Sequence, residues 1–253
     1  MTTALEDLLA GWIGHQRWFA GKGRAIDGVG IESDVELRAG DPGLRHLVVR
    51  VEQAGTRDRY QVLLGTRRTI PPRLEHAHIG GDHYDAAHDA DLTGILLEAM
   101  ARGADIGPLR FRAMEGVTID TGQRSLVLGA EQSNTSLVYG EAYILKLFRR
   151  LIPGVNPELE IVTALARRGA PHIARPYGWF ATDIDGEDTT LAFMQQYLST
   201  ANDGWSLALA SVRDLYGYAH QPEIPASEVG GDFAAESHRL GIATARVHRE
   251  LAA

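Results

Sequence analysis

The chain has 253 residues, 44% of them hydrophobic, with a formal net charge of -8 and no cysteine. The missing cysteine excludes disulfides, thiolate catalysis and Cys-based zinc sites. The acidic balance, without a long Lys/Arg run, argues against a nucleic-acid partner. No apolar run approaches the ~20 residues of a membrane span, and the first ten residues do not resemble a signal peptide, so we expect a cytoplasmic protein without membrane attachment.

The N-terminal part predicts a short helix followed by a small antiparallel sheet. Apolar residues at helical spacing mark the helix: Leu5, Leu8, Leu9, Trp12 and Ile13. Three stretches rich in Val and Leu, at 31–38, 46–52 and 58–64, are separated by glycine-containing turn signals. Meander-like spacing of this kind is typical of an antiparallel sheet.

A polar, histidine-rich stretch at 75–91 comes next, and we expect it to be a solvated loop. Its clustered side chains are His76, His78, His83, His88, Asp82, Asp85, Asp89 and Asp91. Histidine is the commonest metal ligand, so metal binding is the alternative. The irregular spacing favours the loop.

The rest of the chain predicts a second group of strands and then helices. A helix is expected at 92–102, and strands are expected at 109–113, 125–128, 135–139, 142–148, 177–181 and 190–197. Asn156-Pro157 is a strong helix start, and Gly169 is a typical stop. From Ser206 onward the pattern is helical, with a last helix at 233–251. This order indicates an α+β fold.

The stretch with the clearest chemistry is the polar loop at 129–136 and the lysine that follows it. Small hydroxyl and amide residues allow backbone N–H groups to approach a phosphate closely. By strand alternation Lys146 shares a face with Ile144 and Phe148. A carboxylate on the next helix, either Glu158 or Glu160, could hold the lysine in place. The pattern alone is also compatible with a purely structural lysine.

Several motifs taken together resemble the maltokinase family, an actinobacterial group of ATP-dependent maltose 1-kinases. They are Gln16-Arg17-Trp18-Phe19-Ala20-Gly21, Glu131-Gln132-Ser133-Asn134-Thr135-Ser136, Ile144-Leu145-Lys146-Leu147-Phe148-Arg149-Arg150, Asn156-Pro157-Glu158-Leu159-Glu160, Gly204-Trp205, Ala210-Ser211-Val212-Arg213-Asp214-Leu215 and Gly230-Gly231-Asp232-Phe233-Ala234-Ala235-Glu236-Ser237. The resemblance covers the whole chain.

The resemblance implies a fold related to protein kinases and aminoglycoside phosphotransferases. It implies an N-terminal cap with an antiparallel sheet at 1–88, a kinase-like N-lobe of one sheet and one helix at 89–200, and the first helices of a C-lobe at 201–253. The implied activity is transfer of the γ-phosphoryl group of ATP to maltose with Mg²⁺, within carbohydrate metabolism such as glycogen biosynthesis. Trehalose synthase is an implied possible partner.

The resemblance also assigns roles to residues that would bind the nucleotide. Ser133, Asn134, Thr135 and Ser136 would lie over the phosphates, and Lys146 would pair with them. Glu160 is the chosen helix partner of Lys146, with Glu158 as the alternative. A hinge bordering the adenine would comprise four residues: Gln195, Gln196, Tyr197 and Leu198.

The chain is expected to lack catalytic and metal-binding residues of its own, since the family's catalytic Asp and Mg²⁺ ligands would follow residue 253. Two strings, His248-Arg249-Glu250 and Asp232-Phe233-Ala234, resemble kinase motifs, but their order is reversed and they lie in helical patterns. We therefore expect no turnover by these residues alone. The alternatives are a non-catalytic nucleotide- or partner-binding chain, and a kinase of another sugar or aminosugar.

Three further expectations concern side chains and assembly. The four tryptophans are expected to be core or interface anchors rather than sugar platforms. Arg149-Arg150 is expected to be a solvated pair at a strand end. The apolar face of the last helix predicts a homo-oligomer when the chain is studied alone.

Overall fold

The computed structural model describes residues 4–129, 133–217, 225, 228 and 233–252, and it divides into two units. The first unit comprises residues 1–160 and 175–197, and the second comprises 161–174 and 198–253. The helices are α1 Ala4–Ile13, η1 Pro72–Ala77, η2 Ala86–His88, α2 Ala90–Arg102, α3 Pro157–Arg167, α4 Gly204–Gly217 and α5 Phe233–Ala252. The strands are β1 Gly28–Arg38, β2 Gly43–Gln53, β3 Thr56–Thr66, β4 His78–Gly80, β5 His83–Asp85, β6 Asp105–Ile106, β7 Leu109–Ala113, β8 Ser125–Leu128, β9 Thr135–Tyr139, β10 Tyr143–Leu147, β11 Arg150–Leu151, β12 Pro176–Ile184 and β13 Glu187–Gln196.

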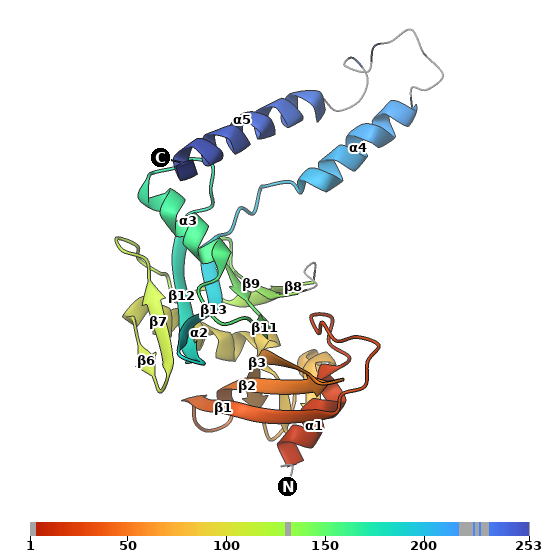
Figure 1. The fold of residues 1–253 in the computed structure, drawn as a ribbon, viewed down its shortest axis with the longest axis vertical. Coiled ribbons are helices and arrows are strands. Elements are labelled where there is room, and N and C mark those ends of the chain that lie inside the picture. Colours follow the sequence, from red (N-terminus) through yellow and green to blue (C-terminus); the bar gives the residue numbers. More distant parts are fainter. Residues whose placement is uncertain (1–3, 130–132, 218–224, 226–227, 229–232, 253) are drawn as a thin grey trace. The chain divides into compact units, whose positions relative to one another are not determined.

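Two antiparallel sheets build the first unit (Figure 1). The first sheet has the order β1-β2-β3-β5-β4, and β11 pairs with the free part of β3. The second sheet has the order β6-β7-β12-β13-β10-β9-β8. The mixed α/β architecture with antiparallel sheets confirms the predicted fold class.

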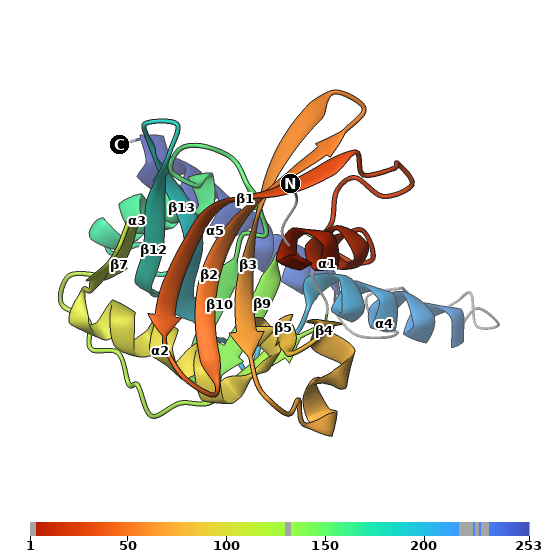
Figure 2. The same cartoon turned by 90° about the horizontal axis from the view of Figure 1, so that it is seen from below.

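Strand β2 of the first sheet is buried on both faces because each face packs against a different layer. Leu47, Val49 and Val51 of β2 join α1 in one core, together with Trp12 and Trp18. The alternate residues of β2, including Leu44 and Val48, face a second core shared with α2 and the second sheet. Figure 2 shows α1 beside the sheet from below. This double burial explains the near-continuous run of Val and Leu in β2.

The histidine-rich stretch is more ordered than the sequence predicts. Instead of a solvated loop it forms η1, the β4–β5 hairpin and η2. Tyr84, Ala86 and Ala87 are buried in the shared core. Gly65 of β3 makes room for the Tyr84 ring, since a Cβ at this position would lie 2.4 Å from Cζ of Tyr84. The apolar residues between the histidines are therefore what hold this segment in place.

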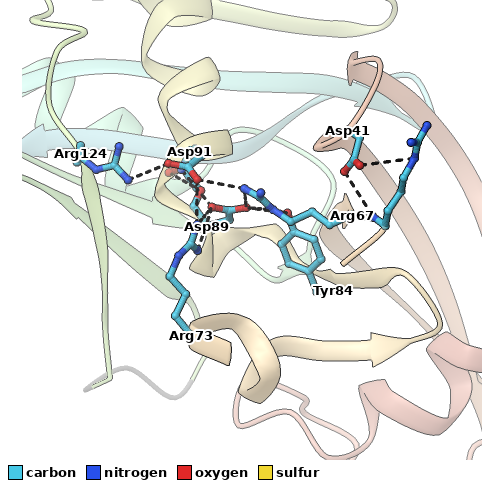
Figure 3. A network of polar contacts seen from close by, with 9 residues as sticks. Asp41, Arg67, Arg73, Tyr84, Asp89, Asp91 and Arg124 are labelled. Atoms are coloured by element: carbon cyan, nitrogen blue, oxygen red, sulfur yellow. Dashed lines mark hydrogen bonds and ion pairs between the residues drawn. The ribbon is translucent and has the colours of Figure 1, made fainter. Parts of the chain in front are cut away.

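A network of arginine–carboxylate pairs surrounds the start of α2 (Figure 3). Asp89 is fully buried, and its Oδ1 accepts a hydrogen bond from the Asp91 backbone N–H, which caps the helix. Arg67 donates to Oδ2 of Asp89 at 2.7 Å, and Tyr84 donates to the same atom at 2.7 Å. The hydrogen bond from Arg124 lowers the pKa of Asp91. These contacts tie β3 and the β4–β5 hairpin to α2.

The second unit consists of the C-terminal part of α3 together with α4 and α5. Arg168 donates to the Glu250 carbonyl at 2.6 Å, and a 3.0 Å contact joins Arg246 to His172. None of the described residues of α5 is buried, and large apolar side chains such as Leu240 and Ile242 are exposed. Among the described residues, no helix is long and apolar enough to cross a membrane.

Candidate nucleotide site

Lys146 and Glu158 form a charged pair on the outer face of the second sheet, opposite the shared core. Leu145 and Leu147 of β10 are fully buried in the shared core, so Lys146 must point to the opposite face. There its Nζ lies 2.5 Å from Oε1 of Glu158. Both side chains stay partly exposed, at 21% and 31%. The pair therefore presents a fixed ammonium group that an anion from solvent can reach.

The start of α3 determines which glutamate meets the lysine. Oδ1 of Asn156 accepts the Glu158 backbone N–H at 2.8 Å, and the Asn156 N–H donates to Thr190 Oγ1 at 3.0 Å. The helix start is thereby capped, as predicted, and tied to β13. Glu158, in the first turn, then faces Lys146.

The prediction that Glu160 is the partner is wrong. Glu160 lies two residues further along α3 and is exposed. Two residues correspond to about 200° around an α-helix, so the Glu158 and Glu160 side chains leave on opposite sides. The sequence could have excluded one of them only if the buried face of the helix had been known.

Ser136 is the neighbour of Lys146 on the next strand. The two residues are directly paired in the β9–β10 register, and Phe193 of β13 is paired with Lys146 on the other side. Ser136 is fully buried, and within the described part of the chain its Oγ has no hydrogen-bond partner. Directly paired residues share a face of the sheet, so the Ser136 and Lys146 side chains lie on the same face.

The other residues predicted for the phosphate loop differ in environment. Ser133 is exposed, Asn134 is half-buried, and Thr135 is buried. Oγ1 of Thr135 accepts a hydrogen bond from Nε of Arg149 at 2.8 Å, so this hydroxyl serves an internal contact. Residues 130–132, which include Glu131 and Gln132 of the motif, lie outside the described residues.

The predicted hinge follows the last strand of the second sheet. Gln195 and Gln196 end β13 and pair with Ile144 and Tyr143 of β10. The Tyr197 N–H donates to the Ala142 carbonyl at 2.9 Å, which continues the ladder by one residue. Leu198 is half-exposed and is the first residue of this stretch assigned to the second unit. The chain thus passes from one unit to the other at the predicted hinge.

Arg149 is buried, which contradicts the prediction of a solvated arginine pair. Its side chain is 1% exposed, and Nη2 lies 2.6 Å from Oδ2 of the equally buried Asp85. The guanidinium carbon also lies 5.0 Å from the centre of the Trp18 ring. Arg150 follows the prediction in part, since it is half-exposed and pairs with Asp58 at 2.8 Å. The guanidinium group of Arg149 can be buried because Asp85, Thr135 and the Gln61 carbonyl accept hydrogen bonds from it.

The histidine–aspartate cluster supplies structural pairs. Asp85 and Asp89 are committed to arginines, and His76 Nε2 lies 3.0 Å from His88 Nδ1. Across the described residues, no group of three or more His, Cys, Asp or Glu side chains is placed to hold a metal ion. Burial lowers the pKa of His88, which favours its neutral form.

The remaining expectations have mixed outcomes. His248, Arg249 and Glu250 lie within α5, while Asp232 lies outside the described residues. Trp12 and Trp18 are buried core residues as predicted, whereas Trp205 is 72% exposed. Sequence reasoning missed the buried contacts of Arg149. The alternation of strand residues cannot reveal them, because Asp85, Thr135 and Trp18 come from other segments of the chain.

Comparisons with known proteins give two kinds of similarity. Residues 12–89 match the family described as the maltokinase N-terminal cap domain. A glucosamine kinase from Streptacidiphilus jiangxiensis is 32% identical over 167 residues, which are 62% of this chain and 35% of that kinase. A glucosamine kinase from Mycolicibacterium smegmatis is 30% identical over 94 residues, which are 37% of this chain and 23% of that protein.

Solved structures of glucosamine kinase have a similar fold. One of them, in complex with glucosamine, ADP and inorganic phosphate, matches with a TM-score of 0.58 at 24% identity, over 100% of this chain and 53% of that chain. A second, in crystal form B, matches with a TM-score of 0.59 at 23% identity, over 98% and 51%. The chain therefore has the mixed α/β fold of these kinases and spans about half of their length.

Proposed function

We propose that the chain supplies the cap and the nucleotide-covering lobe of an ATP-dependent sugar kinase. The observation that carries the proposal is the Lys146–Glu158 pair at 2.5 Å on the outer face of the second sheet. In kinases a lysine of this kind, held by a helix glutamate, contacts the phosphates of ATP. The match of residues 12–89 to a maltokinase cap and the similarity to glucosamine kinases support the same activity.

The residues present suit a nucleoside triphosphate. Lys146 would bind phosphate oxygens, and Glu158 would keep the ammonium group in position. The Ser136 hydroxyl has no partner among the described residues and lies beside Lys146 in the register, so it would donate to the same phosphates. Gln195, Gln196, Tyr197 and Leu198 would border the adenine. Bound ATP supplies the phosphoryl group that is transferred.

The same proposal assigns a part of the kinase to each segment of the chain. Residues 1–88 would form the cap, 89–200 the nucleotide-covering lobe, and 201–253 the first helices of a second lobe. Mg²⁺ would accompany ATP, although the described residues offer no set of ligands for it. We therefore assign no step of the reaction to a metal held by this chain.

The proposed acceptor is a sugar, and two candidates have separate support. The cap match favours maltose, with maltose 1-phosphate as the product. The similarity to glucosamine kinases over longer segments favours an aminosugar. If the acceptor is maltose, trehalose synthase is the proposed protein partner.

Nucleotide binding by the 253-residue chain tests the proposal. Isothermal titration calorimetry with ATP and Mg²⁺ should show saturable binding, and Lys146→Met should weaken it by about tenfold or more, since a hydrogen bond to a charged group contributes about 1.5–3 kcal/mol. Glu158→Gln should weaken binding less, because the ammonium group remains. Glu160→Gln is the matched control and should bind like the original chain. Failure of the original chain to bind ATP, or equal binding by Lys146→Met, would refute the proposal.

The sequence predicts no turnover by these residues alone. ADP release with maltose, glucosamine and glucose as alternative substrates tests that prediction, and any turnover would also report the preferred acceptor. Turnover that depends on Lys146 would show that the chain carries its own catalytic residues. A preference for glucosamine over maltose would support the aminosugar alternative.

A further inference from the structure

The connection between β11 and α3, residues 152–156, is attached to the first part of β13. The ladder between β10 and β13 covers residues 192–196 of β13, and the connection runs along the residues before them. The Thr190 backbone N–H donates to the Gly154 carbonyl oxygen at 3.2 Å, and the Gly154 N–H donates to Oγ1 of Thr189 at 3.2 Å. The connection thereby covers backbone groups at an edge of the strand.

Gly154 has a backbone conformation that suits this attachment. Its φ is 104°, a value that residues with a Cβ rarely adopt. A Cβ here would also lie 3.3 Å from Oε2 of Glu187, the first residue of β13. In this conformation both the N–H and the carbonyl oxygen of Gly154 bond to β13. The connection is therefore held at two points before α3 begins.

Thr190 extends the attachment to the first turn of α3. Its Oγ1 accepts the N–H of Asn156, the residue before the helix, at 3.0 Å. Oδ1 of Asn156 accepts the Glu158 N–H at 2.8 Å, and Oε1 of Glu158 lies 2.5 Å from Nζ of Lys146. Three successive hydrogen bonds therefore join a hydroxyl of β13 to the lysine ammonium group.

Both threonines are buried, Thr189 fully and Thr190 with 5% of its surface exposed. The Thr189 hydroxyl also donates to the Glu187 carbonyl oxygen at 3.0 Å, so it uses its donor and an acceptor position. A backbone N–H that loses a buried acceptor carries a free-energy penalty. Removal of the Thr190 hydroxyl should therefore shift Asn156 and the first turn of α3 with it.

We infer that Thr190, supported by Thr189 and Gly154, is a positioning residue of the candidate nucleotide site. Its hydroxyl fixes the first turn of α3 and so holds the Glu158 carboxylate against Lys146. The inference rests on the proposed function for its effect on nucleotide binding, but not for its effect on the ion pair. The ion pair can therefore be tested in the absence of any nucleotide.

The chain contains two lysines, Lys22 and Lys146, so the state of the ion pair can be measured directly. Lys22 is exposed and serves as the internal reference. Acetylation of the folded chain with limiting reagent, followed by peptide mass spectrometry, gives the rate at Lys146 relative to Lys22. Glu158 shields the Lys146 nitrogen in the original chain. Thr190→Val removes the hydroxyl but keeps the branched shape, and it should raise the relative rate about twofold to fivefold, the range for loss of a partly exposed ion pair.

Three further variants control this measurement. Thr190→Ser keeps the hydroxyl and should restore the original relative rate. Thr190→Ala removes the hydroxyl without adding a methyl group, and it takes the place of Thr190→Val if valine unfolds the chain. Thr182→Val is the matched control, because it removes a buried hydroxyl of β12 whose contact is with the Pro108 carbonyl oxygen. It should leave the relative rate at Lys146 unchanged.

The Glu158→Gln background separates positioning from a general loosening of the sheet. If Thr190 acts through Glu158, Thr190→Val should change neither the acetylation of Lys146 nor the ATP affinity any further in this background. A general loosening would instead add the same factor in both backgrounds. Equal effects with and without the Glu158 carboxylate would overturn the inference, as would an unchanged relative rate in both Thr190→Val and Thr190→Ala.

The ATP affinity is measured separately by calorimetry. Thr190→Val should weaken ATP binding by about twofold to fivefold, and by no more than Glu158→Gln does. Absence of ATP binding by the original chain would refute the proposed function, whereas the acetylation rates would still decide whether Thr190 positions Glu158. Faster acetylation of Lys146 without any change in ATP affinity would overturn the link between this contact and nucleotide binding.

Discussion

His46 is a buried histidine whose protonation should destabilise the fold. The Gln61 amide nitrogen lies 3.0 Å from the Phe148 carbonyl oxygen and 2.5 Å from that of Leu191, so it donates to both, and Oε1 of Gln61 accepts from Nε2 of His46 at 3.0 Å. The neutral ring therefore carries its proton on Nε2. Within the described part of the chain, Nδ1 has no hydrogen-bond partner. A second proton would be placed on this buried nitrogen, near the Arg149 cation.

These surroundings lower the pKa of His46 from 6.5 to about 4, with burial as the main cause and the Arg149 charge as a smaller one. An unfolded chain binds a proton at this histidine as the pH falls below 6.5, whereas the folded chain binds it only near pH 4. Stability therefore falls between these values and levels off below them. Roughly 2.5 pH units at about 1.4 kcal/mol each correspond to a full loss of about 3.5 kcal/mol. About 3 kcal/mol of this is lost by pH 4, where the histidine of the folded chain is half protonated.

Urea unfolding at a series of pH values from 7.5 to 4 measures this loss, with fluorescence of the buried Trp12 and Trp18 as the signal. His46→Gln keeps an amide donor for Gln61 but does not titrate in this range. The unfolding free energy of the original chain should fall by about 3 kcal/mol more than that of His46→Gln between pH 7 and pH 4. His15→Gln, at an exposed histidine, is the control and should follow the original chain. Parallel pH profiles for the original chain and His46→Gln would refute the reasoning.

Two further predictions concern stability. Asp85→Asn should destabilise the first unit by about 3–5 kcal/mol, because it leaves Arg149 buried without a counter-charge, and the double variant Arg149→Met/Asp85→Leu should lose much less; urea unfolding measures both, and a double variant as unstable as the single one would contradict the account. Gly65→Ala should cost about 1–3 kcal/mol, since its Cβ would overlap the Tyr84 ring. Gly11→Ala, in α1 with nothing within 4 Å of the added Cβ, should instead stabilise by about 0.5–1 kcal/mol, and thermal unfolding that ranks the two variants the other way would exclude this explanation.

Much of the secondary structure could be predicted because it depends on neighbours in the sequence. The strands around Lys146 were expected at 135–139 and 142–148, and they occur as β9 and β10. The helix start at Asn156-Pro157 also follows from local capping chemistry, and the structure confirms it. The structure of the stretch at 75–91 was harder to predict, because its polar residues suggest a loop. In the folded chain Tyr84, Ala86 and Ala87 of this stretch are buried in the core that includes residues of α2.

The sequence by itself determined which residue types were available for a nucleotide site and the face of β10 on which Lys146 lies. Periodicity carries this information because a side chain's face depends only on its position along the strand. The tertiary structure alone decided that Glu158 rather than Glu160 meets the lysine, since this depends on how α3 is rotated about its axis. It alone also decided that Arg149 is buried between Asp85, Thr135 and Trp18. These partners lie up to 131 positions away along the chain, and only the packing of the two sheets brings them together.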